Sequence, residues 1–316
     1  MSIWLSVLLF VVGILFVVKG GDWFVDAASW IAKAARIPSF IIGATVVSFA
    51  TTLPEMIVSV IASMENKTDM AVGNAIGSVT ANTGLIMAIA FIFMHVIIDR
   101  KKYIKQSFLL IGTIAILLLG SLTGQLQIWA SIILVGIFFL FMYFNVTDAK
   151  KDRLATADVE ASVEVNGKII FKNIVLFIVG AACIVLGSNL LIKGGSAIAT
   201  FFGVPERVIA ITMVAIGTSL PELVTTITAI IKKESNISIG NIIGANIIDV
   251  SLILPVCSAV SRSKFPISTQ GIMYDIPVCL LITLLALIPL LIRKKGSKIQ
   301  GIVMVLVYIA YLVFTL

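Results

Sequence analysis

The sequence predicts an all-α membrane protein with ten transmembrane helices, arranged as two inverted five-helix repeats with broken helices 2 and 7 at the centre. Three observations lead to this fold class: the apolar composition, the spacing of the apolar runs and a motif that occurs twice. Of the 316 residues, 59% are hydrophobic and only 12% are charged, and the mean hydropathy is +1.14. A soluble domain of this length carries far more charge, so the chain is predicted to cross a membrane several times.

Ten apolar runs follow one another along the chain, and each is long enough for the ~20 residues that a spanning helix needs. They cover residues 3–35, 39–64, 70–98, 104–123, 127–146, 172–203, 206–231, 237–260, 271–292 and 299–315. We therefore predict a first repeat of five helices at residues 1–146 and a second at 172–316. The polar stretch at 147–171 is predicted to be a cytoplasmic linker.

The basic residues predict the orientation, because loops on the cytoplasmic side accumulate lysine and arginine. Loops after odd-numbered helices hold seventeen of them: Lys33, Arg36, Arg100, Lys101, Lys102, Lys105, Lys150, Lys151, Arg153, Lys168, Lys172, Lys232, Lys233, Arg293, Lys294, Lys295 and Lys298. The other side holds four: Lys67, Arg207, Arg262 and Lys264. Both termini are therefore predicted to be extracellular in a multi-pass protein of the cell membrane. The net charge of +7 reflects this topology and requires no nucleic-acid partner.

The repeated motif lies inside apolar runs. Thr51-Thr52-Leu53-Pro54-Glu55 returns in the second half as Thr218-Ser219-Leu220-Pro221-Glu222, and at the same offset Gly73-Asn74-Ala75-Ile76-Gly77-Ser78 returns as Gly240-Asn241-Ile242-Ile243-Gly244-Ala245. Because each predicted repeat has an odd number of helices, the second copy enters the bilayer from the opposite side. Inverted repeats with functional groups at their interface are typical of secondary transporters.

The Pro-Glu pairs place two carboxylates within the membrane, where each costs about 2.5 to 3.5 kcal/mol on insertion scales. Proline within a helix also leaves backbone carbonyls of the preceding turn without donors, here around 48–51 and 215–218. Each motif thus offers carboxylate, hydroxyl and carbonyl oxygens, which hard cations such as Ca²⁺ prefer. Thiolate and imidazole groups, which favour zinc or copper, are absent near both motifs. Glu55 and Glu222, facing each other across the pseudo-two-fold axis, are predicted to bind one ion.

The second motif adds polar groups on the next helix. Ser78 with Asn82, and Ala245 with Asp249, are spaced i, i+4 and share a helix face. Glycines 73, 77, 240 and 244 are predicted to bring these helices close to the broken ones. We expect Asn74 and Asn241 to hydrogen-bond the freed backbone rather than the ion.

Three ionised acids around one Ca²⁺ would leave a net negative charge in a low-dielectric site, so we expect Asp249 to be protonated when calcium is bound.

These motifs resemble those of the calcium/cation antiporter superfamily, specifically sodium/calcium exchangers of the prokaryotic type, and the resemblance extends over essentially the whole chain. It implies that long helices 1 and 6 slide across an eight-helix core, and that transported Ca²⁺ and Na⁺ compete for the glutamates without any other cofactor. It also implies a set of ligands. The calcium site would contain Glu55 and Glu222 with the carbonyls of Thr51 and Thr218, and sodium or accessory sites would draw on Ser48, Thr52, Ser78, Asn82, Ala215, Thr218, Ser219 and Asp249.

The resemblance implies calcium transport but leaves more than one coupling ion open. Ala245 stands where a serine is expected, which removes a hydroxyl from one sodium site. Proton-coupled relatives carry an acid at the positions of Gly77 and Gly244, and its absence favours sodium. Potassium-dependent relatives share an aspartate at the position of Asp249, so potassium or proton coupling remains an alternative.

Other classes of protein fit less well. The sequence has no Walker A motif for ATP binding and no Gly-x-Gly-Asp element of an intramembrane aspartyl hydrolase, so we predict that the protein is not an enzyme. A channel could use the same oxygens. It is distinguished from an exchanger because its ion flux requires no counter-ion.

We expect the exchanger to work as a monomer in the lipid bilayer. Asp22, Asp26, Asn189 and Lys193 are expected to line the surface on which helices 1 and 6 slide.

Overall fold

A computed structural model describes residues 2–94, 96–155, 164–203, 219–261 and 265–315. Apart from two isolated β-bridges, the regular structure of these residues is helical. The helices of the first half are α1 (Ile3–Ala35), α2 (Ser39–Ile42), η1 (Gly43–Val47), α3 (Ser48–Met64), α4 (Thr68–Ala81), η2 (Asn82–Met87), α5 (Ala88–Phe93), α6 (Arg100–Ser121) and α7 (Ile128–Ala155). Those of the second half are α8 (Gly167–Phe201), α10 (Leu220–Ile231), α11 (Ser235–Ile248), η3 (Asp249–Ile253), α12 (Leu254–Val260), η4 (Gly271–Asp275), α13 (Ile276–Arg293) and α14 (Lys298–Thr315).

Nine helical stretches of the described chain are long and apolar enough to cross a membrane. They are Ile3–Ala35, Ser39–Met64, Thr68–Phe93, Arg100–Ser121, Ile128–Asp152, Gly167–Phe201, Ser235–Val260, Gly271–Arg293 and Lys298–Thr315. The predicted seventh helix is described only from Leu220, where α10 begins, so its first part lies outside the described residues. The described stretches otherwise match the ten predicted helices in order and approximate position.

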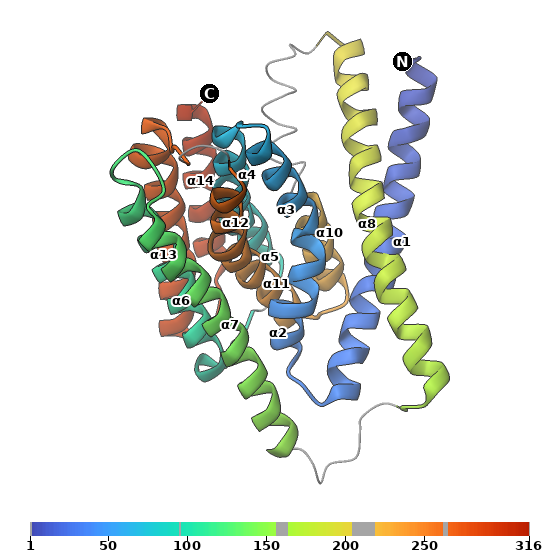
Figure 1. The fold of residues 1–316 in the computed structure, drawn as a ribbon. Helices are drawn as coiled ribbons and strands as arrows, with labels where there is room; N and C mark the ends of the chain where they lie inside the picture. Colours follow the sequence, from blue (N-terminus) through green and yellow to red (C-terminus); the bar gives the residue numbers. More distant parts are fainter. Residues whose placement is uncertain (1, 95, 156–163, 204–218, 262–264, 316) are drawn as a thin grey trace.

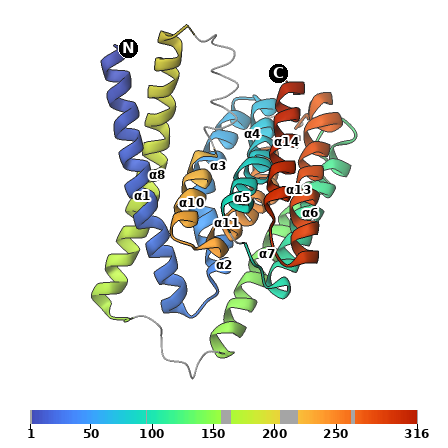
Figure 2. The same ribbon diagram turned by 180° about the vertical axis from the view of Figure 1, so that it is seen from behind.

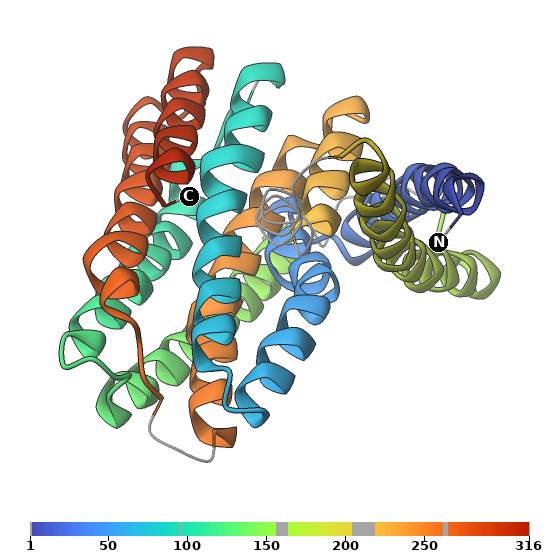
Figure 3. The same ribbon diagram turned by 90° about the horizontal axis from the view of Figure 1, so that it is seen from above.

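Two long helices, α1 and α8, stand beside a bundle formed by the other elements (Figure 1), and Figure 3 shows them at one edge of the molecule. They run antiparallel and cross closely at glycines: a methyl group added at Gly13 would lie 2.9 Å from the Gly187 carbonyl oxygen, and one at Gly20 would lie 2.9 Å from that of Gly180. At the offset of the repeated motifs, Gly13 corresponds to Gly180 and Gly20 to Gly187. Equivalent helices that lie antiparallel are what an inverted repeat requires.

The third and eighth spanning helices form the centre of the bundle. In their most apolar windows, 72% of residues of Thr68–Phe93 and 78% of Ser235–Val260 are buried, against 17% for α1 and for α8. Most side chains on these two helices therefore pack against other helices of the bundle.

The two repeats interlock through glycine. A methyl group at Gly240 would overlap the carbonyl oxygen of Phe40, and one at Gly244 would overlap that of Ala44. The predicted close approach is thus confirmed for α11, and its partner is helix 2 of the other repeat. This packing brings the second-half motif beside the first-half motif.

The linker is shorter than the apolar pattern predicts. Helix α7 continues to Ala155 instead of ending at residue 146, and α8 begins at Gly167 instead of 172. The extension of α7 carries two ion pairs with α6: Lys105 pairs with Asp148 at 2.8 Å and Lys102 with Asp152 at 3.0 Å. The start of α1 and the end of α14 lie at the opposite end of the molecule from the end of α7 and the start of α8 (Figure 2).

Candidate functional site

Helix 2 is interrupted where the sequence predicts a broken helix. A π-helical turn, η1, precedes α3, and Pro54 lies inside α3. Because proline has no N–H, the carbonyl of Ala50 lacks the donor that normally lies four residues later. In helix 7, the described helix begins at Leu220 with Pro221 in its first turn. Each glutamate therefore directly follows a proline, and in α3 this proline interrupts the helical hydrogen-bond pattern.

Three carboxyl groups meet inside the bundle. Glu55 of α3, Glu222 of α10 and Asp249 of η3 are each 1% exposed. Glu55 and Asp249 both lie close enough to Glu222, and to each other, to interact electrostatically. None of their six oxygens has a hydrogen-bond partner among the described residues. Buried charged groups are normally paired or coordinate a cation, so this cluster has the chemistry of a cation site.

Hydroxyl groups from the first repeat face the glutamate of the second. The side chains of Thr51 and Thr52 are directed toward the Glu222 carboxyl group, and both threonines are buried. The Thr51 hydroxyl lies 3.1 Å from Oδ1 of Asn241 and 3.3 Å from the Ser48 carbonyl oxygen, and donates to one of them. The site is thus assembled across the two repeats, as the inverted arrangement predicts.

The two asparagines of the second motif have different partners. Asn74 donates from Nδ2 to the Glu55 carbonyl oxygen at 3.3 Å and to Ser59 Oγ at 2.9 Å, so it bonds the backbone as expected, but at Glu55 and not at the carbonyls of 48–51. Asn241 Oδ1 lies 3.1 Å from the Thr51 hydroxyl, which is a side chain and not the expected backbone, and its Nδ2 has no partner among the described residues. Asn74 therefore holds the Glu55 turn in place, and Asn241 joins the repeats.

Asn82 and Asp249, predicted to flank the centre, each open a π-helical turn: η2 begins at Asn82 and η3 at Asp249. The two turns start at equivalent positions of the two repeats, so they belong to the duplicated architecture. A π turn displaces the helical hydrogen-bond pattern and is frequent at functional sites. The 3.6-residue periodicity of an apolar helix contains no signal for it, and sequence reasoning did not find it.

Asn246 is a site residue that sequence reasoning missed. It is fully buried on α11, accepts from Asn82 Nδ2 at 3.1 Å and donates to Thr83 Oγ1 at 2.8 Å. These contacts orient the Asn82 amide so that its Oδ1, which is buried without a partner among the described residues, remains available. The equivalent position in the first repeat is Val79, so the search for duplicated polar residues passed over it.

Of the remaining predicted site residues, four are described in the structure and two are not. Ser48, Ser78 and Ser219 are buried near the interface of the repeats, and Ala245 is buried on α11. The Ser48 hydroxyl donates to the Thr45 carbonyl oxygen at 3.1 Å. Thr218 and Ala215 lie outside the described residues.

The donor set fits a hard cation that is bound mainly by oxygen. In the described part of the chain, no three histidine, cysteine, aspartate or glutamate side chains are close enough to hold one metal ion. Glu55 and Glu222 with the neighbouring hydroxyl and carbonyl oxygens supply oxygen donors here, and Asp249 interacts electrostatically with both glutamates. This set suits Ca²⁺, which accepts mixed oxygen ligands in a flexible geometry.

The amino-acid sequence of this chain is similar to that of known membrane proteins. The family model described as sodium/calcium exchanger protein matches residues 5–147 and 172–316. The sodium/calcium exchanger MaX1 of Methanosarcina acetivorans is 28% identical over 97% of this chain and 97% of its own length. The inner membrane protein YrbG of Escherichia coli is 34% identical over 79% of this chain and 78% of its own length.

A solved structure has the same fold. The sodium-calcium exchanger NCX_Mj, soaked with Na⁺ and Sr²⁺, superimposes with a TM-score of 0.84, 28% identity and 99% coverage of both chains. The similarity includes both repeats and the core between them.

Proposed function

Because this chain belongs to the sodium/calcium exchanger protein family, we propose that it is a secondary transporter that exchanges Ca²⁺ for Na⁺ across the membrane by alternating access. It is a multi-pass membrane protein and not an enzyme. The observation that carries the proposal is the cluster of Glu55, Glu222 and Asp249, whose buried oxygens have no partner in the described structure. Intramembrane acids of this kind mark ion pathways.

The calcium site proposed here consists of the Glu55 and Glu222 carboxylates with the carbonyl oxygens of Thr51 and Thr218. Its support is that Glu55 and Glu222 interact electrostatically while Thr51 lies beside Glu222. Sodium would use oxygens around this centre, drawn from Ser48, Thr52, Ser78, Ala215, Thr218 and Ser219, with Asn82 and Asp249 at its edges. Shared glutamates make the binding of the two ions competitive.

The mechanism follows from the charge of the site. An empty site would carry two or three buried negative charges, and covering these charges with the apolar surface of a sliding helix is costly. One Ca²⁺, or several Na⁺, neutralises the glutamates and lowers that cost. Helices α1 and α8, which lie outside the bundle and are mostly exposed to lipid, are the elements that would slide across it.

For the cellular setting, we propose that the protein lies in the cell membrane as a monomer, with both termini outside. The support is the excess of lysine and arginine in loops at the linker end. These include Lys102 and Lys105, which pair with acids of the extended α7.

Potassium coupling is the second candidate, and it rests on Asp249. This acid is buried in a π turn without a hydrogen-bond partner among the described residues, and Asn82 takes its place in the first repeat. An unpaired acid outside the glutamate pair is suited to an accessory monovalent cation.

A counter-ion screen in proteoliposomes tests the proposal. Uptake of ⁴⁵Ca²⁺ is measured with an opposed gradient of sodium, of potassium or of protons, at fixed membrane potential. We expect uptake with the sodium gradient alone, because the site lacks the additional acids of proton-coupled relatives. Calcium uptake without any counter-ion would identify a channel and contradict exchange.

A further inference from the structure

Two loops at the linker end of the bundle join to form a groove. Gly296 N donates to the Val96 carbonyl oxygen at 2.9 Å, and Ile98 N to that of Lys294 at 2.9 Å, which makes a β-bridge between Ile97 and Lys295. The groove beside this bridge has a volume of about 560 Å³. Its lining includes Phe91, Phe93, Met94, Ile97, Lys295 and Lys298.

The rim of this groove is strongly basic. Six basic residues are exposed on the joined loops and the adjoining helix ends: Arg100, Lys101, Arg293, Lys294, Lys295 and Lys298. None of the six forms an ion pair with a described residue. The nearby Lys102 and Lys105, in contrast, are paired with acids of α7. One acid, Asp99, lies between residues 91 and 105, and it caps α6 by accepting from Lys101 N.

Apolar side chains extend from the same edge. Phe93 is 72% exposed, Ile97 68% and Ile299 75%. Exposed side chains of this size at a helix end lie favourably against acyl chains. The groove therefore combines cationic and apolar surface at the boundary where lipid headgroups lie.

The fold builds this junction twice. At the opposite end, Leu126 N donates to the Phe265 carbonyl oxygen at 2.9 Å and Ile267 N to that of Gly124 at 3.1 Å, so that Gln125 bridges Pro266. Ile97 corresponds to Pro266, and Gln125 to Lys295, at nearly the same offset as the repeated motifs. The two junctions are therefore equivalents in the inverted repeats.

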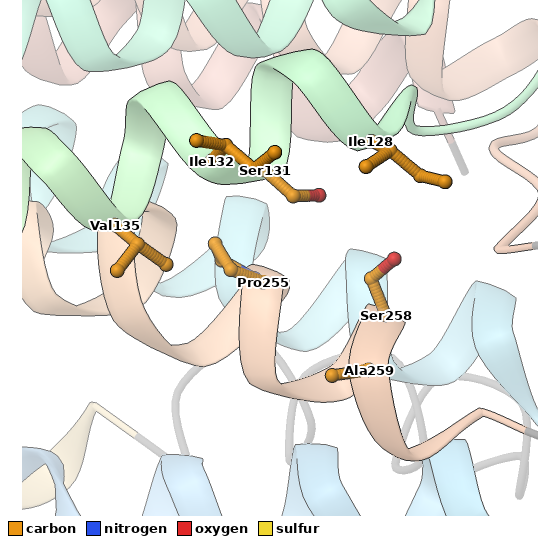
Figure 4. Close-up of a pocket in the computed structure, with 7 residues that line it drawn as sticks. All are labelled: Ile128, Ser131, Ile132, Val135, Pro255, Ser258 and Ala259. Carbon is orange, nitrogen blue, oxygen red and sulfur yellow. The ribbon is translucent and has the colours of Figure 1, made fainter.

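A groove also accompanies this second junction, but its character differs. It has a volume of about 470 Å³, and Figure 4 shows that Ile128, Ser131, Ile132 and Val135 face Pro255, Ser258 and Ala259 across it. The described residues of this lining carry no charged side chain. Lys295 and Lys298 therefore have no basic counterpart among the described residues that line the second groove.

We propose that the groove at the linker end binds an anionic phospholipid of the surrounding leaflet. Its phosphate group lies between Lys295 and Lys298, and its acyl chains follow Phe93 and Ile97. A basic pocket between transmembrane helices is suited to such headgroups. The exposed apolar edge distinguishes a lipid from a soluble phosphate, which would gain nothing from Phe93 or Ile97.

The test measures which lipid the full-length protein retains. Protein is reconstituted in equimolar phosphatidylglycerol and phosphatidylcholine, extracted, and analysed for bound lipid by native mass spectrometry. We expect the wild type to retain phosphatidylglycerol preferentially. In Lys295→Gln/Lys298→Gln, the preference is expected to fall roughly fivefold for each lysine removed, and Lys295→Arg/Lys298→Arg is expected to retain it.

The matched control is Lys168→Gln/Lys172→Gln, which removes the same charge from α8 at the linker end but outside the groove, and is expected to retain the wild-type preference. An equal fall in this control would overturn the proposal in favour of a general surface charge effect. The proposal would also be overturned if the wild-type protein retained phosphatidylglycerol and phosphatidylcholine equally. Displacement of the lipid by inorganic phosphate, beyond the effect of chloride at equal ionic strength, would overturn it in favour of a soluble anion. Circular dichroism checks that each variant is folded, and none of these results depends on calcium exchange.

Discussion

Glu55 and Glu222 are the residues on which ion exchange should depend most strongly. Both are buried, and their oxygens lack hydrogen-bond partners among the described residues. Replacement by glutamine keeps the shape of each side chain but removes one of the charges that balance Ca²⁺. Losing one member of a buried charge pair costs about 3 kcal/mol or more, which corresponds to on the order of 100-fold in affinity.

We therefore predict that Glu55→Gln and Glu222→Gln each weaken calcium binding by on the order of 100-fold and nearly abolish sodium-driven uptake of ⁴⁵Ca²⁺. Glu164→Gln serves as the control, since this glutamate is exposed near the start of α8 and accepts a hydrogen bond from Asn166. Normal flux in either core variant would show that the site is assigned incorrectly.

Asp249 should behave differently from the two glutamates. Its carboxyl group interacts with both glutamates, but the two glutamates already balance the charge of one Ca²⁺. We predict that Asp249→Asn, which mimics a protonated side chain, retains calcium exchange to within about threefold, a difference of less than 1 kcal/mol. Sodium-driven uptake in proteoliposomes measures it, and complete loss of uptake in a folded variant would mean that Asp249 is ionised and needed in the calcium-bound state.

Among the residues of the candidate site, the sequence predicts those that occur in both repeats and misses those that occur in only one. Glu55 and Glu222 stand out because each repeats the other in an apolar setting, and the structure brings them together. Asn246 has Val79 as its counterpart and looks like an isolated polar residue in an apolar helix. Its role becomes visible only when the packing places it beside Asn82 and Thr83.

Among the elements, the contact of α11 with helix 2 holds the two motifs together. It depends on Gly244, where an added methyl group would overlap the carbonyl oxygen of Ala44 and approach the Ser48 hydroxyl at 2.6 Å. Because the obstacle is backbone, rotation of a side chain cannot relieve it. Overpacking of this kind typically costs about 1–3 kcal/mol.

We predict that Gly244→Ala lowers the thermal stability of the purified protein and reduces calcium affinity, because α11 and helix 2 must separate. Gly136→Ala is the matched control: it also lies inside a spanning helix, and no described atom lies within 4 Å of an added methyl group. Thermal unfolding in detergent and calcium titration measure the two effects. Equal stability in both variants would show that helix 2 can shift without loss.

The elements show why apolar periodicity predicts some features and not others. Length and hydropathy identify the membrane-spanning stretches, because burial in lipid acts on every residue of a span. Helix α7 continues past the apolar run that ends at residue 146, and Asp148 and Asp152 in this continuation pair with lysines of α6. The π turns at Asn82 and Asp249 were not predicted, because one additional residue in a turn leaves the apolar composition unchanged.

In the whole molecule, a charged network joins α1 to the bundle at the linker end. Lys232 lies 2.8 Å from Asp26 and 3.4 Å from Asp22. Glu234 accepts from the Ser29 hydroxyl at 2.6 Å and lies 3.8 Å from Lys33. The network connects an element expected to slide with the turn between α10 and α11. It therefore favours the arrangement in which this end of the interface is closed.

The inverted repeat supplies a counterpart with the charges exchanged. At the offset of the repeated motifs, Lys193 corresponds to Asp26 and Glu65 corresponds to Lys232, so an acid and a base again occupy equivalent positions. In this structure Glu65 pairs with Lys67 at 2.7 Å, and no ion pair among the described residues links it to Lys193. Inverted repeats exchange their conformations in the opposite access state. We expect that state to form the Lys193–Glu65 pair and to break the Asp26–Lys232 pair.

This expectation is tested with two substitutions that should act in opposite directions. A thiol introduced by Thr228→Cys, at a position that contacts Gly21 of α1, reports opening at the linker end through its rate of labelling by a maleimide. Lys232→Gln removes up to about 1 kcal/mol from the closed arrangement and should raise that rate by as much as about fivefold. Lys193→Gln weakens the opposite state and should lower the rate. If both substitutions raise it, the two pairs are not alternative contacts of one transition, and the network at Lys232 only stabilises the fold.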